Sequence, residues 1–167
     1  MALEADVAKI AEQEAALVFQ SFDEAAALAI GLSIKAAAEA KGKALAIDIR
    51  LWNRPLFFFA MPGTSFDNAE WVRRKSNCVR RYGRPSYAIS LRLKKNSGGT
   101  LFAADDGVDP MELAAHGGSF PIRIAGAGIV GSITVSGVPG RDDHGFVVAA
   151  IAQHLGLDPA PLAFAPE

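Results

Sequence analysis

Hydrophobic residues recur along this sequence at spacings that predict helices alternating with short strands. Helical spacing appears in residues 2–16, 23–40 and 68–82, and in a last helix that begins near Asp142–Asp143. Asp23 is the predicted N-cap of the second of these helices. Apolar residues cover nearly the whole circumference of that helix, which predicts that most of it is buried.

Strand patterns fall between the helices. Residues 44–51 alternate apolar and polar positions, whereas residues 56–61 are apolar throughout and include three consecutive phenylalanines. A continuous apolar run predicts a strand that is covered on both faces. Residues 121–125 and 129–135 are rich in β-branched residues and are joined by glycines, which predicts an antiparallel hairpin. Residues 17–19 are a candidate for a short additional strand.

The remaining segments are less regular. Residues 86–95 fit a helix or a strand equally well. Asp109 followed by proline predicts a short helix that ends near His116–Gly117. Asp67, with a glutamate three positions later, predicts a capping box for the helix over 68–82. Strand pairs joined by short turns favour an antiparallel sheet with helices packed on it. We therefore predict one α+β domain over residues 1–167.

Composition and charge narrow the range of partners. Of the 167 residues, 50% are hydrophobic and 21% are charged, and the formal net charge is −1. A balanced charge gives no general attraction to nucleic acid or to a membrane surface. The N-terminus lacks the basic start and apolar run of a signal peptide, and no apolar run approaches the roughly 20 residues of a membrane helix. These features predict a cytoplasmic protein.

Few residues offer obvious chemistry. Cys78 is the only cysteine, so a disulfide within the chain or a cysteine metal cluster is excluded, and the apolar helix face around it predicts an inert core thiol. His116 and His144 flank the predicted hairpin and could bind a ligand or transfer protons near pH 7; each could equally be a hydrogen-bonded structural histidine. Two histidines without a third ligand make no zinc site, so no metal is predicted. Gly117, Gly118 and Ser119 could present backbone N–H groups to an anion, or simply permit a turn.

Lys75 lies in the middle of the apolar side of helix 68–82. Burial of an unpaired ammonium is costly, so three arrangements are open. The side chain could extend to the edge of the apolar surface, pair with a buried carboxylate such as Asp48, or face a pocket and bind an anionic ligand. Arg73 belongs to a basic face on the other side of the helix, which could hold propionates, phosphates or RNA. A solvated or intersubunit face is the simpler interpretation.

Several motifs along the chain resemble the haem-degrading-domain family, which includes GlcG-like and PduO C-terminal domains, and specifically its uncharacterised UPF-type branch. The motifs are Asp48-Ile49-Arg50, Pro62-Gly63-Thr64, Asn68 with Trp71-Val72-Arg73-Arg74-Lys75, Ala115-His116-Gly117-Gly118-Ser119-Phe120-Pro121-Ile122, Val135-Ser136-Gly137 and Asp143-His144.

The resemblance implies a profilin-like fold, with an antiparallel sheet of about five strands, and a homo-oligomer. Some members of the family bind haem or a cobalamin-type tetrapyrrole, so haem is implied as a cofactor by resemblance alone. The sequence lacks a Cys-x-x-Cys-His haem-attachment motif.

Three functions remain open at this point. The first is an oligomeric protein that binds a small anionic ligand, with the site formed by the residues named above: Asp48, Arg73, Lys75, His116, Gly117, Gly118, Ser119 and His144. The second is a haem-degrading or other redox enzyme that uses the same site. The third is a structural or partner-binding oligomer without small-molecule chemistry.

Overall fold

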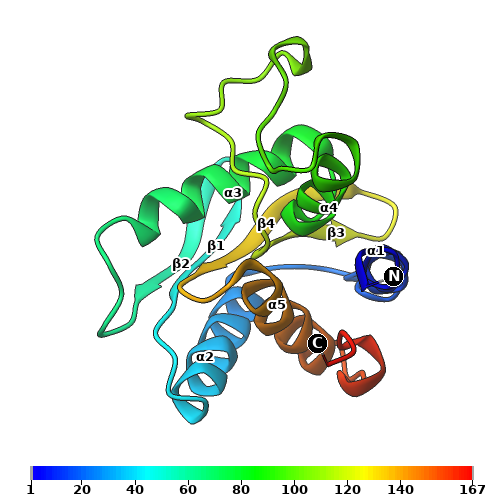
Figure 1. The fold of residues 1–167 in the computed structure, drawn as a ribbon. Helices are drawn as coiled ribbons and strands as arrows, with labels where there is room; N and C mark the ends of the chain where they lie inside the picture. The colour runs from blue at the N-terminus through cyan, green and yellow to red at the C-terminus, as the bar shows by residue number, and fades with distance from the viewer. Residues whose placement is uncertain (1, 167) are drawn as a thin grey trace.

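The computed structural model describes residues 2–166 and confirms the α+β class. Figure 1 shows the helices arranged around one sheet. In chain order the elements are α1 (Ala2–Ala16), α2 (Glu24–Ala40), β1 (Ala46–Leu51), β2 (Arg54–Ala60), α3 (Asn68–Tyr82), α4 (Ser86–Ser97), the 3-10 turn η1 (Ala104–Asp106), β3 (Ser119–Ile124), β4 (Gly128–Ser136), α5 (Gly140–His154) and the 3-10 turn η2 (Ala160–Leu162). Within the described residues, none of the helices has the length and apolar character that a membrane crossing requires.

The sheet is antiparallel, in the order β2-β1-β4-β3. It has four strands in the described part of the chain, where about five were expected. The hairpin of β3 and β4 is confirmed. Residues 17–19 do not form a strand, because only Phe19 pairs with the sheet, through one bridge to Ile124. Leu17 and Phe19 instead place their side chains in the main core.

Helices cover the two faces of the sheet differently. Figure 1 shows α2 and α5 on one face and α3 on the opposite face. Alternation along the strands sorts the side chains accordingly: Ile47 and Ile49 of β1 lie opposite Val135 and Ile133 of β4 on the α2/α5 face. The α3 face carries a polar set instead, made up of Asp48, Ser119, Ser132, Thr134 and Ser136.

The predictions that strand β2 and helix α2 are mostly buried were wrong. β2 is an edge strand, and Phe58 and Phe59 are 51% and 37% exposed. The apolar run of β2 is therefore not covered on both faces. Leu28 and Leu32 of α2 are also about half exposed, because α2 contacts the sheet along only one side. That contact is close: a Cβ on Gly31 would lie 2.5 Å from the Phe57 ring.

The structure decides two segments whose sequence patterns were irregular. Residues 86–95 belong to a helix, α4, which buries its apolar side chains against α3 and α1. The short helix predicted after Asp109 is absent. The Asp109 carbonyl accepts from the N–H groups of Glu112 and Leu113, which closes a single turn. Arg74 then donates to the carbonyls of Pro110 and Leu113, and the chain has no helix or strand from there to β3.

One predicted helix cap is confirmed, and two predicted helix starts differ from the structure. Asp23 caps α2 as expected, accepting from the Ala26 N–H at 2.9 Å. Asp67 precedes α3 but makes no cap bond, because its carboxylate accepts from Trp71 Nε1 instead. α5 begins at Gly140 after Pro139, so Asp142 and Asp143 lie inside its first turn rather than at the N-cap.

Candidate functional site

A buried ion pair joins α3 to α5 beneath the polar face of the sheet. Lys75 Nζ donates to Asp143 Oδ2 at 2.7 Å and to the carbonyl of Val135 at 3.1 Å. Both side chains are at least 96% buried. Burial lowers the pKa of Lys75 and raises the pKa of Asp143, while the attraction between the two charges opposes both shifts. Of the three arrangements considered for Lys75, the structure therefore shows pairing with a buried carboxylate.

Asp48 is not that carboxylate. Its two oxygens accept from Arg50 Nε at 2.7 Å and Arg50 Nη2 at 2.8 Å. The two residues are separated by one position in β1 and so point to the same face of the sheet. A bidentate pair of this kind satisfies the Asp48 carboxylate within β1. Lys75 therefore pairs with Asp143 of α5 instead.

The ion pair forms one wall of a cleft of 290 Å³, which we call the His116 cleft. The lining comes from α3, the loop before β3, the end of β4 and the start of α5. It comprises Asn68, Trp71, Lys75, His116, Ser136, Gly137, Val138, Gly140 and Asp143. His116 packs edge-on against Trp71, with 5.0 Å between ring centroids. The cleft thus brings two of the predicted site residues, Lys75 and His116, to one place.

The His116 ring has an asymmetric environment. Its Nδ1 is buried and has no hydrogen-bond partner among the described residues. Burial lowers the pKa of His116, and the positive charges of Lys75, Arg74 and Lys94 lower it further, so the ring is neutral near pH 7. A buried N–H without an acceptor is more costly than a bare lone pair, so we assign the proton to Nε2. His116 is then a hydrogen-bond donor at the cleft.

Helix N-termini reinforce the positive potential around this donor. Asn68 is the first residue of α3 and Gly140 the first residue of α5, and both line the cleft. Unpaired N–H groups in the first turn of a helix favour negative charge nearby. Asp143 offsets part of this potential but is itself paired with Lys75. The cleft can therefore hold a small anion.

Gly117 and Gly118 shape the site without lining it. A Cβ on Gly117 would lie 2.0 Å from the carbonyl oxygen of Gly140, so only glycine lets the loop pass the start of α5. Gly118 has φ +128°, and a Cβ there would lie 2.9 Å from Lys75 Nζ. Ser119 is fully buried and bonds Thr134 Oγ1 at 2.8 Å, away from the cleft.

His144 does not join His116. Its side chain is fully buried on the other side of α5, where Nε2 contacts Gln13 Oε1 at 2.7 Å. The surrounding rings are those of Tyr87, Phe120 and Phe164. Burial lowers the pKa of His144 to about 3, so the ring is a neutral core histidine.

Arg73 and Cys78 also lie apart from the cleft. Arg73 is on the outer side of α3, where its guanidinium pairs with Glu70 and Glu112. The thiol of Cys78 is buried between α3 and α4, and burial raises its pKa to about 12, as expected for an inert core cysteine. No group of three or more histidine, cysteine, aspartate or glutamate side chains in residues 2–166 is arranged to hold a metal ion.

Sequence reasoning missed several members of the cleft. Asp143 and Trp71 occur in the motifs of the family resemblance, but the sequence analysis does not include either residue in the predicted site. A signal was available for Asp143, because a buried lysine requires a nearby carboxylate. Ser136 lies in the Val135-Ser136-Gly137 motif without being assigned to the site, and no local pattern marks Gly140, since the position of both depends on how β4 and α5 meet.

Several known proteins resemble this chain in sequence or in fold. A UPF0303 protein of Mesorhizobium japonicum is 45% identical over 167 residues, covering 100% of this chain and 99% of its own length. The solved structure of Ybr137w has a TM-score of 0.79 at 24% identity, covering 90% of this chain and 87% of that one. A structure of a PduOC–haem complex has a TM-score of 0.65 at 16% identity, covering 81% and 94%. A family model for haem degrading protein HbpS-like matches residues 22–152, and the chain therefore belongs to that family.

Proposed function

We propose that this protein binds a small anionic ligand in the His116 cleft. The observation that carries the proposal is that His116, with its assigned Nε2–H donor, lines a cleft near the positive charges of Lys75, Arg74 and Lys94. A volume of 290 Å³ is just below the usual range for small-molecule sites, which favours a compact ligand such as a short carboxylate or phosphate.

Titration calorimetry with acetate, succinate and inorganic phosphate tests the proposal, with acetamide as the neutral analogue. We expect one-site binding of at least one anion and none of acetamide. The variant His116→Phe keeps an aromatic ring against Trp71 but removes the donor, and should weaken binding at least tenfold. His154→Phe, on the exposed end of α5, is the matched control. Failure of all three anions to bind, or equal binding by His116→Phe, would contradict the proposal.

Haem is a second candidate, supported by the family description and by the haem complex of PduOC. His116 does not fit the role of an axial ligand, because iron would need the Nε2 lone pair and the proton would move to Nδ1. Nδ1 has no acceptor among the described residues, whereas a metal-bound histidine almost always donates its other N–H. The cleft is also too small to enclose a tetrapyrrole.

A haemin titration followed by absorbance separates the two candidates. For the anion-binding function, we expect any haemin spectrum of the wild type to be unchanged in His116→Phe. A saturable Soret shift that is lost in this variant would show that His116 ligates iron and would replace the assignment of Nε2–H as a donor.

We also infer that the protein self-associates through the edge of the sheet. β2 has an open outer edge with exposed apolar side chains on both sides: Phe59 with Leu28 and Leu32 on the α2 side, and Phe58 on the α3 side. Light scattering after size exclusion measures the mass of the assembly. Phe58→Ser with Leu32→Ser should reduce it to one chain, while Leu101→Ser, an exposed residue in the 98–118 loop, should leave it unchanged. A monomeric wild type would contradict this inference.

A further inference from the structure

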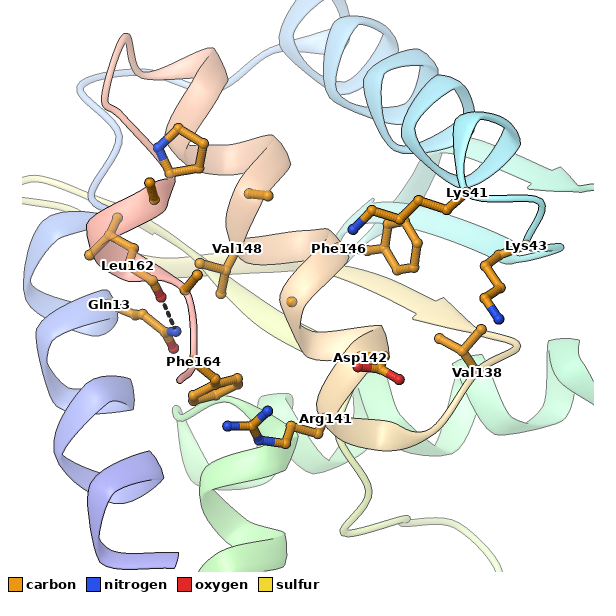
Figure 2. A pocket seen from close by; sticks show the side chains of 15 residues that line it. Gln13, Lys41, Lys43, Val138, Arg141, Asp142, Phe146, Val148, Leu162 and Phe164 are labelled. Carbon is orange, nitrogen blue, oxygen red and sulfur yellow. Dashed lines mark hydrogen bonds between the residues drawn. The ribbon is translucent and has the colours of Figure 1, made fainter. Parts of the chain in front are cut away.

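A second and larger cavity lies on the other side of the first turns of α5. It has a volume of 570 Å³ and is open to solvent between α5, the end of α2 and the segment after α5, which we call the tail (residues 158–166) (Figure 2). Gly145 and Ala149 lie on one face of α5 and form its floor, with Phe146 on one side and Val148 on the other. Leu162 and Phe164 of the tail form one wall. We call this cavity the tail groove.

The wall formed by the tail is held in place by side chains from both ends of the chain. Lys9 Nζ donates to the carbonyl of Pro161 at 2.9 Å, and Gln13 Nε2 donates to that of Leu162 at 2.7 Å. Arg141 Nη2 donates to the carbonyl of Ala165 at 2.7 Å. These bonds fix the tail away from the floor, so the groove is built into the fold rather than left by a loose end.

Charge is distributed unevenly around the groove. Figure 2 shows Lys41 and Lys43 at the end opposite the tail. Neither ammonium forms an ion pair with a described residue; Lys41 lies over the ring of Phe146, 5.0 Å from its centroid. Asp142 is the acidic residue of the rim, and Arg141 is neutralised by Asp6. The two lysines together with Asp142 leave one positive charge beside an apolar floor.

We propose that the tail groove binds an amphipathic carboxylate, with its apolar chain along Ala149 and Leu162 and its carboxylate between Lys41 and Lys43. Apolar floor and cationic end match the two halves of such a ligand. The volume lies within the range of small-molecule sites. The site shares only Val138 with the His116 cleft, so the proposal is independent of the function proposed there.

Octanoate, octanol and octylammonium have the same eight-carbon chain but are anionic, neutral and cationic. Titration calorimetry of the whole protein at fixed ionic strength measures the binding of each. We expect octanoate to bind one site, at least tenfold more tightly than octylammonium. Lys41→Gln with Lys43→Gln should weaken octanoate about tenfold and leave octanol unchanged. Lys95→Gln, an exposed lysine on α4, is the matched control for general electrostatics.

A second variant tests the location. Ala149 lines the groove from α5, so Ala149→Trp fills it with a bulky ring while the helix remains continuous. Octanoate binding should be lost in Ala149→Trp and kept in His116→Phe, with both variants showing the wild-type helix content by circular dichroism. The proposal is overturned if octanoate does not saturate, if octylammonium binds as tightly, if Lys95→Gln weakens octanoate as much as the double variant, or if a folded Ala149→Trp protein still binds octanoate.

Discussion

The two faces of the sheet are built from the same strands but hold their helices by different forces. The face under α2 and α5 is a continuous apolar core that includes Ile47, Ile49 and Ile133. The face under α3 is held by polar contacts, such as Ser76 Oγ to Ser132 Oγ at 2.7 Å and Lys75 Nζ to the Val135 carbonyl at 3.1 Å, and Lys75 also pairs with Asp143 of α5. Apolar packing is non-directional, whereas each polar contact depends on a specific partner. The His116 cleft lies on the polar face.

Specific polar partners make the α3 face less tolerant of single changes and more tolerant of paired ones. Removing one member of a buried pair leaves the other without a partner, but removing both can be nearly neutral. On the apolar face, each deletion removes contacts whether or not a second residue changes with it. The following four predictions test this contrast.

The largest effect is expected at the buried ion pair. Lys75→Met leaves Asp143 charged and unpaired, and should lower the free energy of unfolding by about 4 kcal/mol. The double variant Lys75→Met, Asp143→Leu removes both charges and should recover most of that loss. Urea denaturation of the wild type, the two single variants and the double variant gives the coupling between the residues. A double variant as unstable as the singles would show that the pair is not the cause.

On the apolar face, Ile133→Ala should cost about 3 kcal/mol, because the side chain is fully buried in the main core and its removal leaves a cavity. Urea denaturation measures the loss. Combining it with Ile47→Val should add a further penalty instead of restoring stability. Recovery of stability in that double variant would remove the contrast between the two faces.

His144, on the α5 side, should contribute to the pH dependence of stability. Its folded pKa of about 3 lies below the ordinary value of 6.5, so the unfolded chain binds the additional proton between these values. The free energy of unfolding should therefore fall as the pH drops from 6.5 toward 3, at up to about 1.4 kcal/mol per pH unit from this residue. Denaturation series at pH 7 and pH 5 should show a shallower decline for His144→Asn than for His154→Asn. Equal slopes would mean that His144 does not contribute.

The smallest effect is expected for the two serines that join α3 to β4. Ser132→Ala alone should cost about 1 kcal/mol, since the Ser76 hydroxyl then lacks its partner. The double variant Ser76→Ala, Ser132→Ala should differ from the wild type by less than about 1 kcal/mol. Thermal unfolding of both variants is sufficient to compare them, and an additive loss would contradict the pairing argument.

The elements that could be predicted from sequence are those whose pattern is complete within one segment. The hairpin of β3 and β4 and the Asp23 cap depend on residues close together in the chain. The segment after Asp109 carried the local signals of a helix start, yet it forms only a turn, and Arg74 of α3 bonds the carbonyls of Pro110 and Leu113. Tertiary contacts override local preference at such places.

For the candidate site, the chemistry was predictable and the partners were not. A lysine in an apolar side indicated a buried charge and Asp48 was the predicted partner, but the actual partner, Asp143, lies 68 residues from Lys75 and is brought to it by the meeting of α3 and α5. His144 resembled His116 in its neighbouring glycine, and only the position of Gln13 on α1 shows that it belongs to the core. The exposure of Phe58 likewise follows from strand order, which no single strand reveals.

The attachment of the tail to α1 has a consequence for how the chain acquires its structure during translation. α1 already has an apolar docking surface on α4, where Ile10 packs against Tyr87 and Leu91. Lys9 and Gln13 bond carbonyls about 150 positions later, so the tail is the part that joins α1 last. A nascent chain stalled before residue 160 should therefore leave this side of α1 accessible to proteases and chaperones.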